Sequence, residues 1–151
     1  MHHVLPMAEP TIQPMLSYED VGAAASWLAD VFGLTEVQRF TDDQGRVSHC
    51  VMSLDDGIFH LGNPSPDYVG PRRHAESCEQ ARRWRESPMI VDGVLAYVPD
   101  LAAHFDRVRA AGATILSEPA EGGAGMLYRV EDVEGHRWMF AQRRGPDPGV
   151  V

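Results

Sequence analysis

The sequence contains no lysine, and all 13 of its basic residues are arginines. Without a lysine amine there is no Schiff-base chemistry and no phosphate-binding loop of the kind that needs a lysine. Acidic residues outnumber basic ones by 22 to 13, which gives a formal net charge of −9. Nucleic acids and anionic membrane surfaces are bound mainly through a positive field, so this charge argues against both as partners.

Cysteines and long apolar runs are also scarce. Cys50 and Cys78 are the only two cysteines, which is too few for a disulfide scaffold, and they are too far apart for a short-spaced zinc pair. No stretch approaches the roughly 18 apolar residues of a membrane span, and no basic segment followed by an apolar run opens the chain. These absences predict a cytoplasmic protein that is neither secreted nor inserted in a membrane.

Secondary-structure signals occur twice, in the same order. The 151 residues, 44% of them hydrophobic, suffice for one core or for two small modules that share one. In each half a strand precedes a helix that begins after an aspartate, Asp20 or Asp100, and three more strands follow. The halves align at an offset of about eighty residues.

This repeat divides the chain into five predicted segments. They are a flexible N-terminus over 1–10, a first βαβββ module over 11–63, a connector with a short helix over 64–88, a second βαβββ module over 89–144, and a flexible tail over 145–151.

A short acidic turn precedes the last predicted strand of each half. In the second half, Glu134-Gly135 supplies the residue that tolerates positive φ ahead of the strand over 137–143. In the first half, Asp55-Asp56-Gly57 precedes the strand over 58–62 in the same way. The other predicted strands cover 11–17, 35–41, 47–54, 89–98, 114–119 and 126–130, and a glycine-rich loop covers 121–125.

The connector is rich in arginine and contains one predicted helix, over 74–86. Two interpretations of the arginines stay open. They form a wall that binds an anion, or they belong to a solvated helix face and pair with nearby glutamates at helical spacing. The five residues are Arg72, Arg73, Arg82, Arg83 and Arg85.

The two strand–helix–three-strand modules resemble the vicinal oxygen chelate superfamily, which includes glyoxalase I, bleomycin-resistance proteins and extradiol dioxygenases. The turn Asp132-Val133-Glu134-Gly135 before the last strand is similar to a turn that recurs in these proteins. The resemblance spans about residues 11–143. It implies an α+β fold whose two modules form an open cup, and it implies a homodimer, with exchanged modules in some members.

Metalloenzymes of this superfamily bind a divalent ion with one side chain from each of four strands. The resemblance carries these positions over to Gln13, His60, Val94 and Met139. Only His60 is a good ligand among them, because valine cannot ligate and a thioether does not suit the magnesium, manganese, nickel or zinc of such sites. Because the sequence departs from the ligand set of these metalloenzymes, we expect a cup without a metal or other cofactor. Metal-dependent glyoxalase or dioxygenase activity is therefore unexpected.

The lining predicted for the cup is apolar with a few polar groups, which suits a flat organic molecule. If Met139 points into the cup, the two-residue repeat of a strand turns Trp138 and Phe140 toward the helices. Trp84 and Tyr128 are the candidates for stacking on a ligand, with a place in the core as the alternative for each tryptophan. The predicted ligand-binding residues are Gln13, Met15, His60, Trp84, Val94, Tyr128 and Met139.

His60 has three possible roles: a general base near neutral pH, a hydrogen-bond donor to a ligand, or a structural histidine. His49, in a neighbouring predicted strand, is a candidate to pair with it. Cys50 adjoins His49 in the sequence, but adjacent residues of a strand point to opposite faces. The two therefore do not form a nucleophile and base pair.

The function expected from these observations is sequestration of a small apolar or aromatic molecule, as in the bleomycin-resistance branch that the sequence resembles. The alternative is a lyase, isomerase or dioxygenase-like enzyme of the same superfamily with a reduced site around His60. A third possibility is a role in assembly or regulation with no small ligand.

Overall fold

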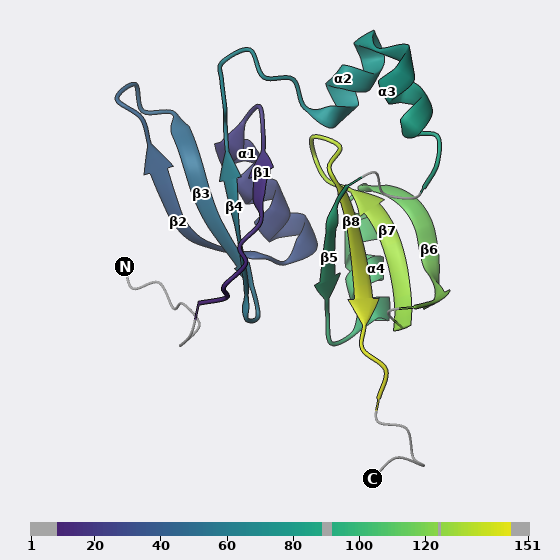
Figure 1. The fold of residues 1–151 in the computed structure, drawn as a ribbon. Coiled ribbons are helices and arrows are strands. Elements are labelled where there is room, and N and C mark those ends of the chain that lie inside the picture. The colour runs from purple at the N-terminus through teal and green to yellow at the C-terminus, as the bar shows by residue number, and fades with distance from the viewer. Residues whose placement is uncertain (1–8, 89–91, 124, 146–151) are drawn as a thin grey trace.

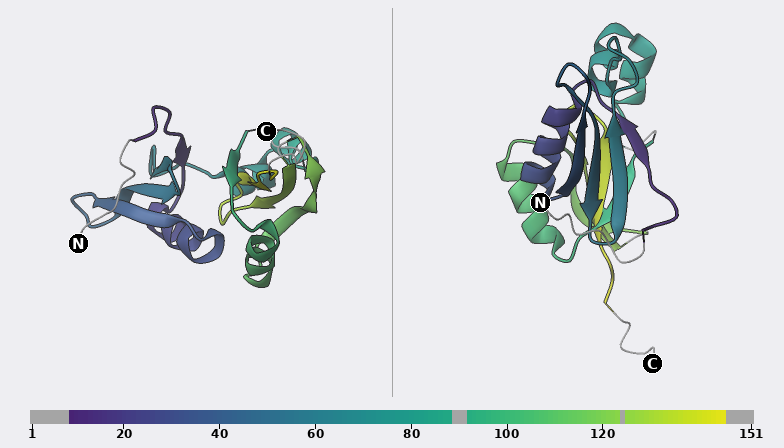
Figure 2. Two further views of the ribbon diagram at one scale, coloured as in Figure 1. Left: turned by 90° about the horizontal axis from the view of Figure 1, so that it is seen from below. Right: turned by 90° about the vertical axis from the view of Figure 1, so that its left-hand side faces the viewer.

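The computed structural model describes residues 9–88, 92–123 and 125–145. Within these ranges the chain forms two four-stranded sheets that lie side by side, and a helix packs against one face of each (Figure 1). Both of these helices lie on the same side of the molecule, as Figure 2 shows from below. The predicted α+β fold of two repeated modules that form an open cup is therefore confirmed. None of the helices in these ranges is long and apolar enough to cross a membrane.

The first module has the sheet order β1-β4-β3-β2, in which β1 is parallel to β4 and the other pairs are antiparallel. Its helix α1 continues directly into a π-helical segment, η1. The elements are β1 (Met15–Ser17), α1 (Val21–Trp27), η1 (Leu28–Phe32), β2 (Thr35–Thr41), β3 (Val47–Leu54) and β4 (Gly57–Gly62).

The second module repeats this plan with the order β5-β8-β7-β6, and β5 is parallel to β8. Two short helices from the connector, α2 (Pro71–Ser77) and α3 (Glu79–Trp84), lie above one end of its sheet (Figure 1). The elements of the module are β5 (Val94–Tyr97), α4 (Leu101–Ala110), β6 (Thr114–Gly122), β7 (Gly125–Glu131) and β8 (Arg137–Gln142).

The helix starts agree with the sequence pattern. Asp20 accepts a hydrogen bond from the backbone N–H of Ala23 at 3.0 Å, and Asp100 accepts one from Ala103 at 3.1 Å. Each aspartate thus satisfies an N–H group that has no partner inside its helix. Gly33, at φ 78°, ends the helical segment of the first module as predicted.

Four local predictions were wrong. The connector forms two helices instead of one over 74–86, and β1 is shorter than the predicted strand over 11–17. The predicted loop over 121–125 is too long, because β6 extends to Gly122 and β7 begins at Gly125; residue 124 lies outside the described residues. In the turn before β4 the positive φ of 52° falls on Asp55, not on Gly57.

Other predictions lie partly outside the described residues. This holds for the beginning of the strand over 89–98 and for most of the two predicted flexible termini.

The hydrophobic core crosses the boundary between the modules. The Phe32 ring, at the end of η1, contacts Trp138 and Phe140 of β8 with centroid distances of 5.4 and 4.9 Å. Phe59 of β4 contacts the same Trp138 at 5.3 Å. All four side chains are at most 6% exposed and belong to a single cluster. The two modules therefore share one core and bury apolar surface that neither would bury alone.

A buried carboxylate, Asp132, organises the turn between β7 and β8. Its Oδ1 accepts hydrogen bonds from the backbone N–H groups of Glu134 and His136 at 3.0 and 2.9 Å. Its Oδ2 accepts from the Trp138 indole at 3.1 Å and from the Tyr18 hydroxyl of the first module at 2.5 Å. Gly135, at φ 94°, closes the turn. One side chain thus fixes the turn and also joins the modules.

Polar contacts from the same turn extend the junction. The Glu134 carboxylate accepts from the backbone N–H groups of Glu19 and Asp20 at 2.6 and 2.9 Å. His136 Nε2 donates to the Ser17 carbonyl at 2.6 Å. Burial raises the pKa of Glu134, although the two backbone donors oppose the shift.

We expect Asp132→Asn to lower the free energy of unfolding by about 2–3 kcal/mol, because its amide group faces the Trp138 and Tyr18 donors with a donor of its own. Asp42→Asn is the matched control. Asp42 makes the same two backbone contacts in the turn between β2 and β3, but it bonds no buried side chain. Urea unfolding measures both changes. An equal, small loss in the two variants would contradict the role assigned to Asp132.

Candidate functional site

The candidate site is the pair of sheet faces turned away from the helices, here called the open faces. Side chains alternate along the strands, so residues next to core residues point to the open side. Cys50 and Met52 of β3 are fully buried in the core, and His49 and Val51 therefore lie on the open face of the first sheet. The sequence-based separation of Cys50 from His49 is confirmed. Burial raises the pKa of the Cys50 thiol to about 11, so it is protonated at neutral pH.

Three polar side chains form a hydrogen-bonded chain on the open face of the first sheet. His60 Nε2 lies 2.7 Å from the side-chain oxygen of Gln13, and His60 Nδ1 lies 2.8 Å from His49 Nε2. The Gln13 amide nitrogen donates to the Pro10 carbonyl at 3.1 Å, which directs its oxygen to His60. His60 therefore donates to Gln13, and His49 donates to His60.

Both ring nitrogens of His60 are thus occupied in its neutral form. Burial is the main cause that lowers the pKa of His60, and the positive charge available to His49 lowers it further. Protonation would place a second N–H on His60 opposite the N–H that His49 donates. This set of hydrogen bonds is consequently most stable when His60 is uncharged.

The open face of the second sheet is largely apolar. Met139 of β8 is in register with Leu95 of β5 and with Arg129 of β7, so these three side chains lie level with one another. Leu127, two residues before Arg129, is on the same face and is 8% exposed. Leu95 is 48% exposed. A hydrophobic surface that includes Arg129 therefore faces outward here.

Tyr128 and Val94, which were predicted to bind the ligand, do not point to the open side of this sheet. Tyr128 is fully buried against α4, where its hydroxyl meets His104 Nδ1 at 2.7 Å, and burial raises its pKa. Val94 is in register with Trp138 and packs against the core, although part of it stays exposed. Leu95 is the β5 residue level with Met139. The sequence pattern missed this one-residue difference because the register between β5 and β8 depends on their pairing.

One of the four metal-ligand positions implied by the resemblance also shifts with this register. Met15 pairs with His60 and Leu95 with Met139, so Gly93 of the second module corresponds to Gln13 of the first. The set becomes one amide, one histidine whose nitrogens are both hydrogen-bonded, one glycine and one thioether. Such a set does not fit a divalent ion. Within the described ranges, no three His, Cys, Asp or Glu side chains gather closely enough to hold one.

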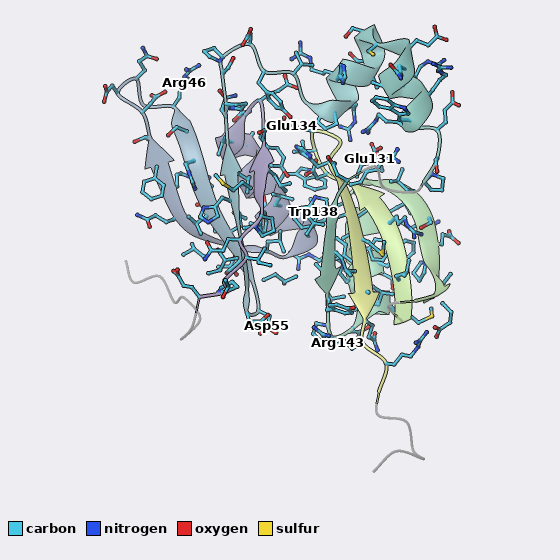
Figure 3. All side chains as sticks on the ribbon, viewed as in Figure 1. Arg46, Asp55, Glu131, Glu134, Trp138 and Arg143 are labelled. Carbon is cyan, nitrogen blue, oxygen red and sulfur yellow. The ribbon has the colours of Figure 1, made fainter. Side chains whose placement is uncertain are left out.

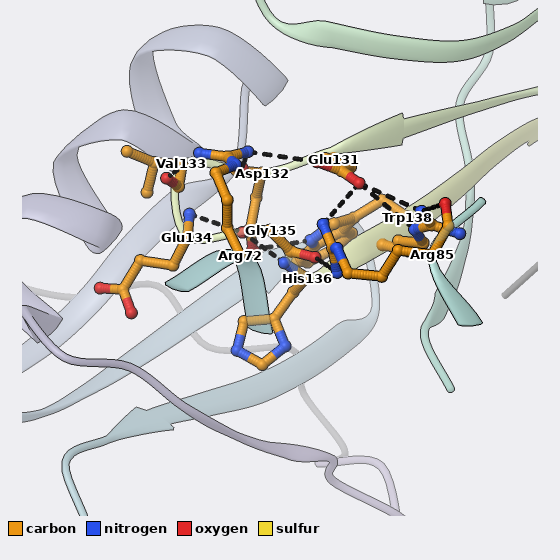
Figure 4. Close-up of polar contacts among 10 residues, drawn as sticks. Arg72, Arg85, Glu131, Asp132, Val133, Glu134, Gly135, His136 and Trp138 are labelled. Atoms are coloured by element: carbon orange, nitrogen blue, oxygen red, sulfur yellow. Dashed lines mark hydrogen bonds and ion pairs between the residues drawn. The ribbon is translucent and has the colours of Figure 1, made fainter. Parts of the chain in front are cut away.

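The connector arginines mostly bind acidic residues of the protein itself. Glu131, which is 6% exposed, accepts from Arg72 at 3.3 Å, from Arg85 at 2.6 Å and from Arg137 at 3.3 Å (Figure 4). Figure 3 shows Glu131 at the end of the second sheet that lies under α2 and α3. This cluster holds the connector on the sheet.

Of the other connector arginines, Arg82 fits one of the two interpretations and Arg73 fits neither. Arg82 pairs with Glu79 and Glu86 along its helix, as the solvated-face interpretation predicts. Arg73 pairs with Glu19 of the first module. Arg72 and Arg85 match neither interpretation, because they bind a carboxylate in the second sheet instead of a free anion or a neighbour on the helix.

Hollows follow the seam between the modules. One of about 260 Å³ is lined by Ile12, Leu95 and Tyr97 among others, and one of about 390 Å³ by Met15, Val94 and Arg137. A third, of about 340 Å³, lies under α2 and α3 and includes Trp84. Met15, Val94 and Trp84 therefore border hollows, while Gln13, His60 and Met139 lie on the open faces. Trp84, 52% exposed, is separate from the His60 group.

A model of the Glyoxalase/Bleomycin resistance protein/Dioxygenase superfamily matches residues 2–140. The chain therefore belongs to this superfamily. No curated protein sequence matches it at a significant level.

Solved structures share the fold over nearly their whole length. TioX from Micromonospora sp. ML1 is 26% identical, with a TM-score of 0.63 over 91% of this chain and 99% of TioX. TnmS3, an antibiotic binding protein from Streptomyces sp. CB03234, is 14% identical, with a TM-score of 0.61 over 89% and 98% of the two chains. The fosfomycin resistance protein FosX from Listeria monocytogenes is 10% identical, with a TM-score of 0.59 over 91% and 96%.

The His60 contacts give a pH-dependent prediction. Folding lowers the pKa of this base, so the folded protein binds fewer protons than the unfolded chain just below pH 6.5, and acidification through that range destabilises it. An NMR titration of the His60 ring should show a midpoint below 6.5. His49→Gln should raise that midpoint, because it removes a positive neighbour. A midpoint at or above 6.5 in the unmodified protein would refute the assignment.

Proposed function

We propose that this protein binds a small apolar or aromatic molecule in the cup formed by its open faces, and that it does so without a metal and without changing the molecule. The observation that carries the proposal is the composition of the second open face. Leu95, Leu127 and Met139 present an apolar surface at the position where a metalloenzyme of the superfamily would need ligands. Apolar walls with a few placed polar groups are typical of sites for organic ligands.

The first open face supplies the polar groups. Gln13, His60 and His49 hold one another in a fixed arrangement, and a ligand can exchange one of these hydrogen bonds for its own. Because neither nitrogen of His60 is free in its neutral form, the arrangement suits recognition better than proton abstraction. The antibiotic-binding description of TnmS3, which has the same fold, adds support for a small-molecule ligand.

A neutral aromatic probe, N-phenyl-1-naphthylamine, tests the location of the site. We expect saturable binding, measured by fluorescence titration, that Met139→Glu weakens about tenfold or more, because a buried methionine side chain contributes roughly 1.5–3 kcal/mol. Met126→Glu is the control. Met126 is exposed and lies on the other face of the neighbouring strand β7. Equal loss in both variants would place the probe elsewhere.

Two further measurements, the mass of the recovered ligand and the melting temperature of the protein, separate a binder from an enzyme. A binder returns its ligand with unchanged mass and raises its own melting temperature when ligand is present. Turnover of a planar drug, or stoichiometric metal in protein purified without added ion, would favour the enzymatic alternative around His60.

We also propose that the protein acts as a homodimer, within the cytoplasm. A large apolar side chain lies beside the open faces: Ile12 is 83% exposed. A monomer would leave it in water, whereas a second copy would cover it. Cys50 and Cys78 are both free, which suits a reducing compartment.

Light scattering after size-exclusion chromatography should give twice the chain mass of 16.7 kDa. Ile12→Glu should weaken the dimer about tenfold, because it places a charge on the apolar contact. Ala102→Glu, on the exposed side of α4, should leave the mass unchanged. A monomer at micromolar concentration would refute this part of the proposal.

A further inference from the structure

Arg129 lies in the middle of the apolar open face of the second sheet. Its neighbours in β7, Tyr128 and Val130, are fully buried against the helix side of the sheet. The alternation of side chains therefore turns Arg129 to the open side, level with Met139 of β8 and Ser117 of β6. The sequence pattern gave this arginine no role.

No acidic partner reaches the Arg129 guanidinium within the described part of the chain. Its Nε is buried and has no hydrogen-bond partner there, and none of the ion pairs in those ranges includes it. The acidic residue on the same face of β7 is Glu131, but both of its oxygens already bind other arginines (Figure 4). A buried donor on a cation without a partner is costly, so proteins seldom leave one without a function.

Arginines gather near this face although the whole molecule is acidic. The chain carries a net charge of −9, yet Arg72, Arg85 and Arg137 surround the carboxylate of Glu131, two residues along β7 from Arg129. The first open face contributes imidazoles and an amide, and no carboxylate takes part in its hydrogen-bonded chain. A positive spot against apolar walls attracts a negative group more strongly than the same charge in open water.

We propose that Arg129 binds an anionic oxygen group, such as a carboxylate or sulfonate, on a ligand whose aromatic body lies against Leu95, Leu127 and Met139. The proposal rests on the proposed function and narrows its ligand class from apolar molecules to aromatic acids. A planar guanidinium can donate two parallel hydrogen bonds to such a group. The terminal nitrogens of the guanidinium are the donors that this contact would use, because the Nε is buried.

Two fluorescent probes that differ in one charged group provide the test. 8-Anilinonaphthalene-1-sulfonate has the aromatic body of N-phenyl-1-naphthylamine with an added sulfonate. We expect the unmodified protein to bind the sulfonate about tenfold more tightly at low salt, and the preference to shrink as salt is added. Arg129→Met should abolish the preference and leave the affinity for the neutral probe within about twofold, since methionine keeps the apolar contact.

Arg83→Met is the matched control, because it removes the same charge from an exposed position on α3. It should keep the preference for the sulfonate, and Arg129→Lys should retain part of it. If Arg129→Met and Arg83→Met reduce sulfonate binding equally, the effect is one of net charge. Arg129 is then not the residue that binds the anionic group. If Arg129→Met weakens the binding of both probes alike, the residue supports the cup without selecting an acid. The assignment of Arg129 to the anionic group is then wrong as well. If neither probe binds the unmodified protein, both the role of Arg129 and the proposed function are wrong.

Discussion

The buried carboxylate of Asp132 is the constraint on which the rest of the structure depends. It is 1% exposed and accepts four hydrogen bonds, two from its own turn, one from the Trp138 indole and one from the Tyr18 hydroxyl of the other module. A charge so deeply buried is tolerated only when donors surround it. Burial, followed by the charge of Asp132, raises the pKa of Tyr18 well above its usual value, which keeps its hydroxyl a donor.

This junction determines how the two open faces lie relative to each other. With Tyr18 and Trp138 held on one carboxylate, β1 and β8 are fixed near the seam, and the shared core around Phe32 fills the space behind them. On the helix side, His104 adds a second link, since its Nε2 donates to the Phe32 carbonyl at 2.8 Å. The polar face of the first sheet and the apolar face of the second therefore form a single cup on one rigid support.

Local signals in the sequence were enough to predict the order of the elements. Asp20 and Asp100 cap equivalent helices, and Gly135 takes the positive φ that its turn requires. The site was harder to predict, because its positions depend on pairing between distant strands. Leu95 instead of Val94 lies level with Met139 for this reason.

The sequence did not indicate a binding role for Arg129, for a related reason. The order of residues does not show that Arg72 and Arg85, far away in the sequence, form ion pairs with Glu131. Arg129 therefore has no ion pair with this neighbouring carboxylate. Tyr128 was misassigned because the side of β7 on which it lies is decided by its packing against α4. Contacts between segments far apart in the chain thus decide which polar groups remain available to a ligand.

In the proposed function, one ligand contacts both open faces at once. Methyl NMR of the labelled methionines, with saturating N-phenyl-1-naphthylamine, tests it directly. Met15 lies beside His60 on the first sheet, Met139 lies on the second, and Met52 is buried beneath the first. We expect the Met15 and Met139 methyl signals both to shift while that of Met52 stays in place. Bound probe that leaves either the Met15 or the Met139 signal unchanged would contradict this claim.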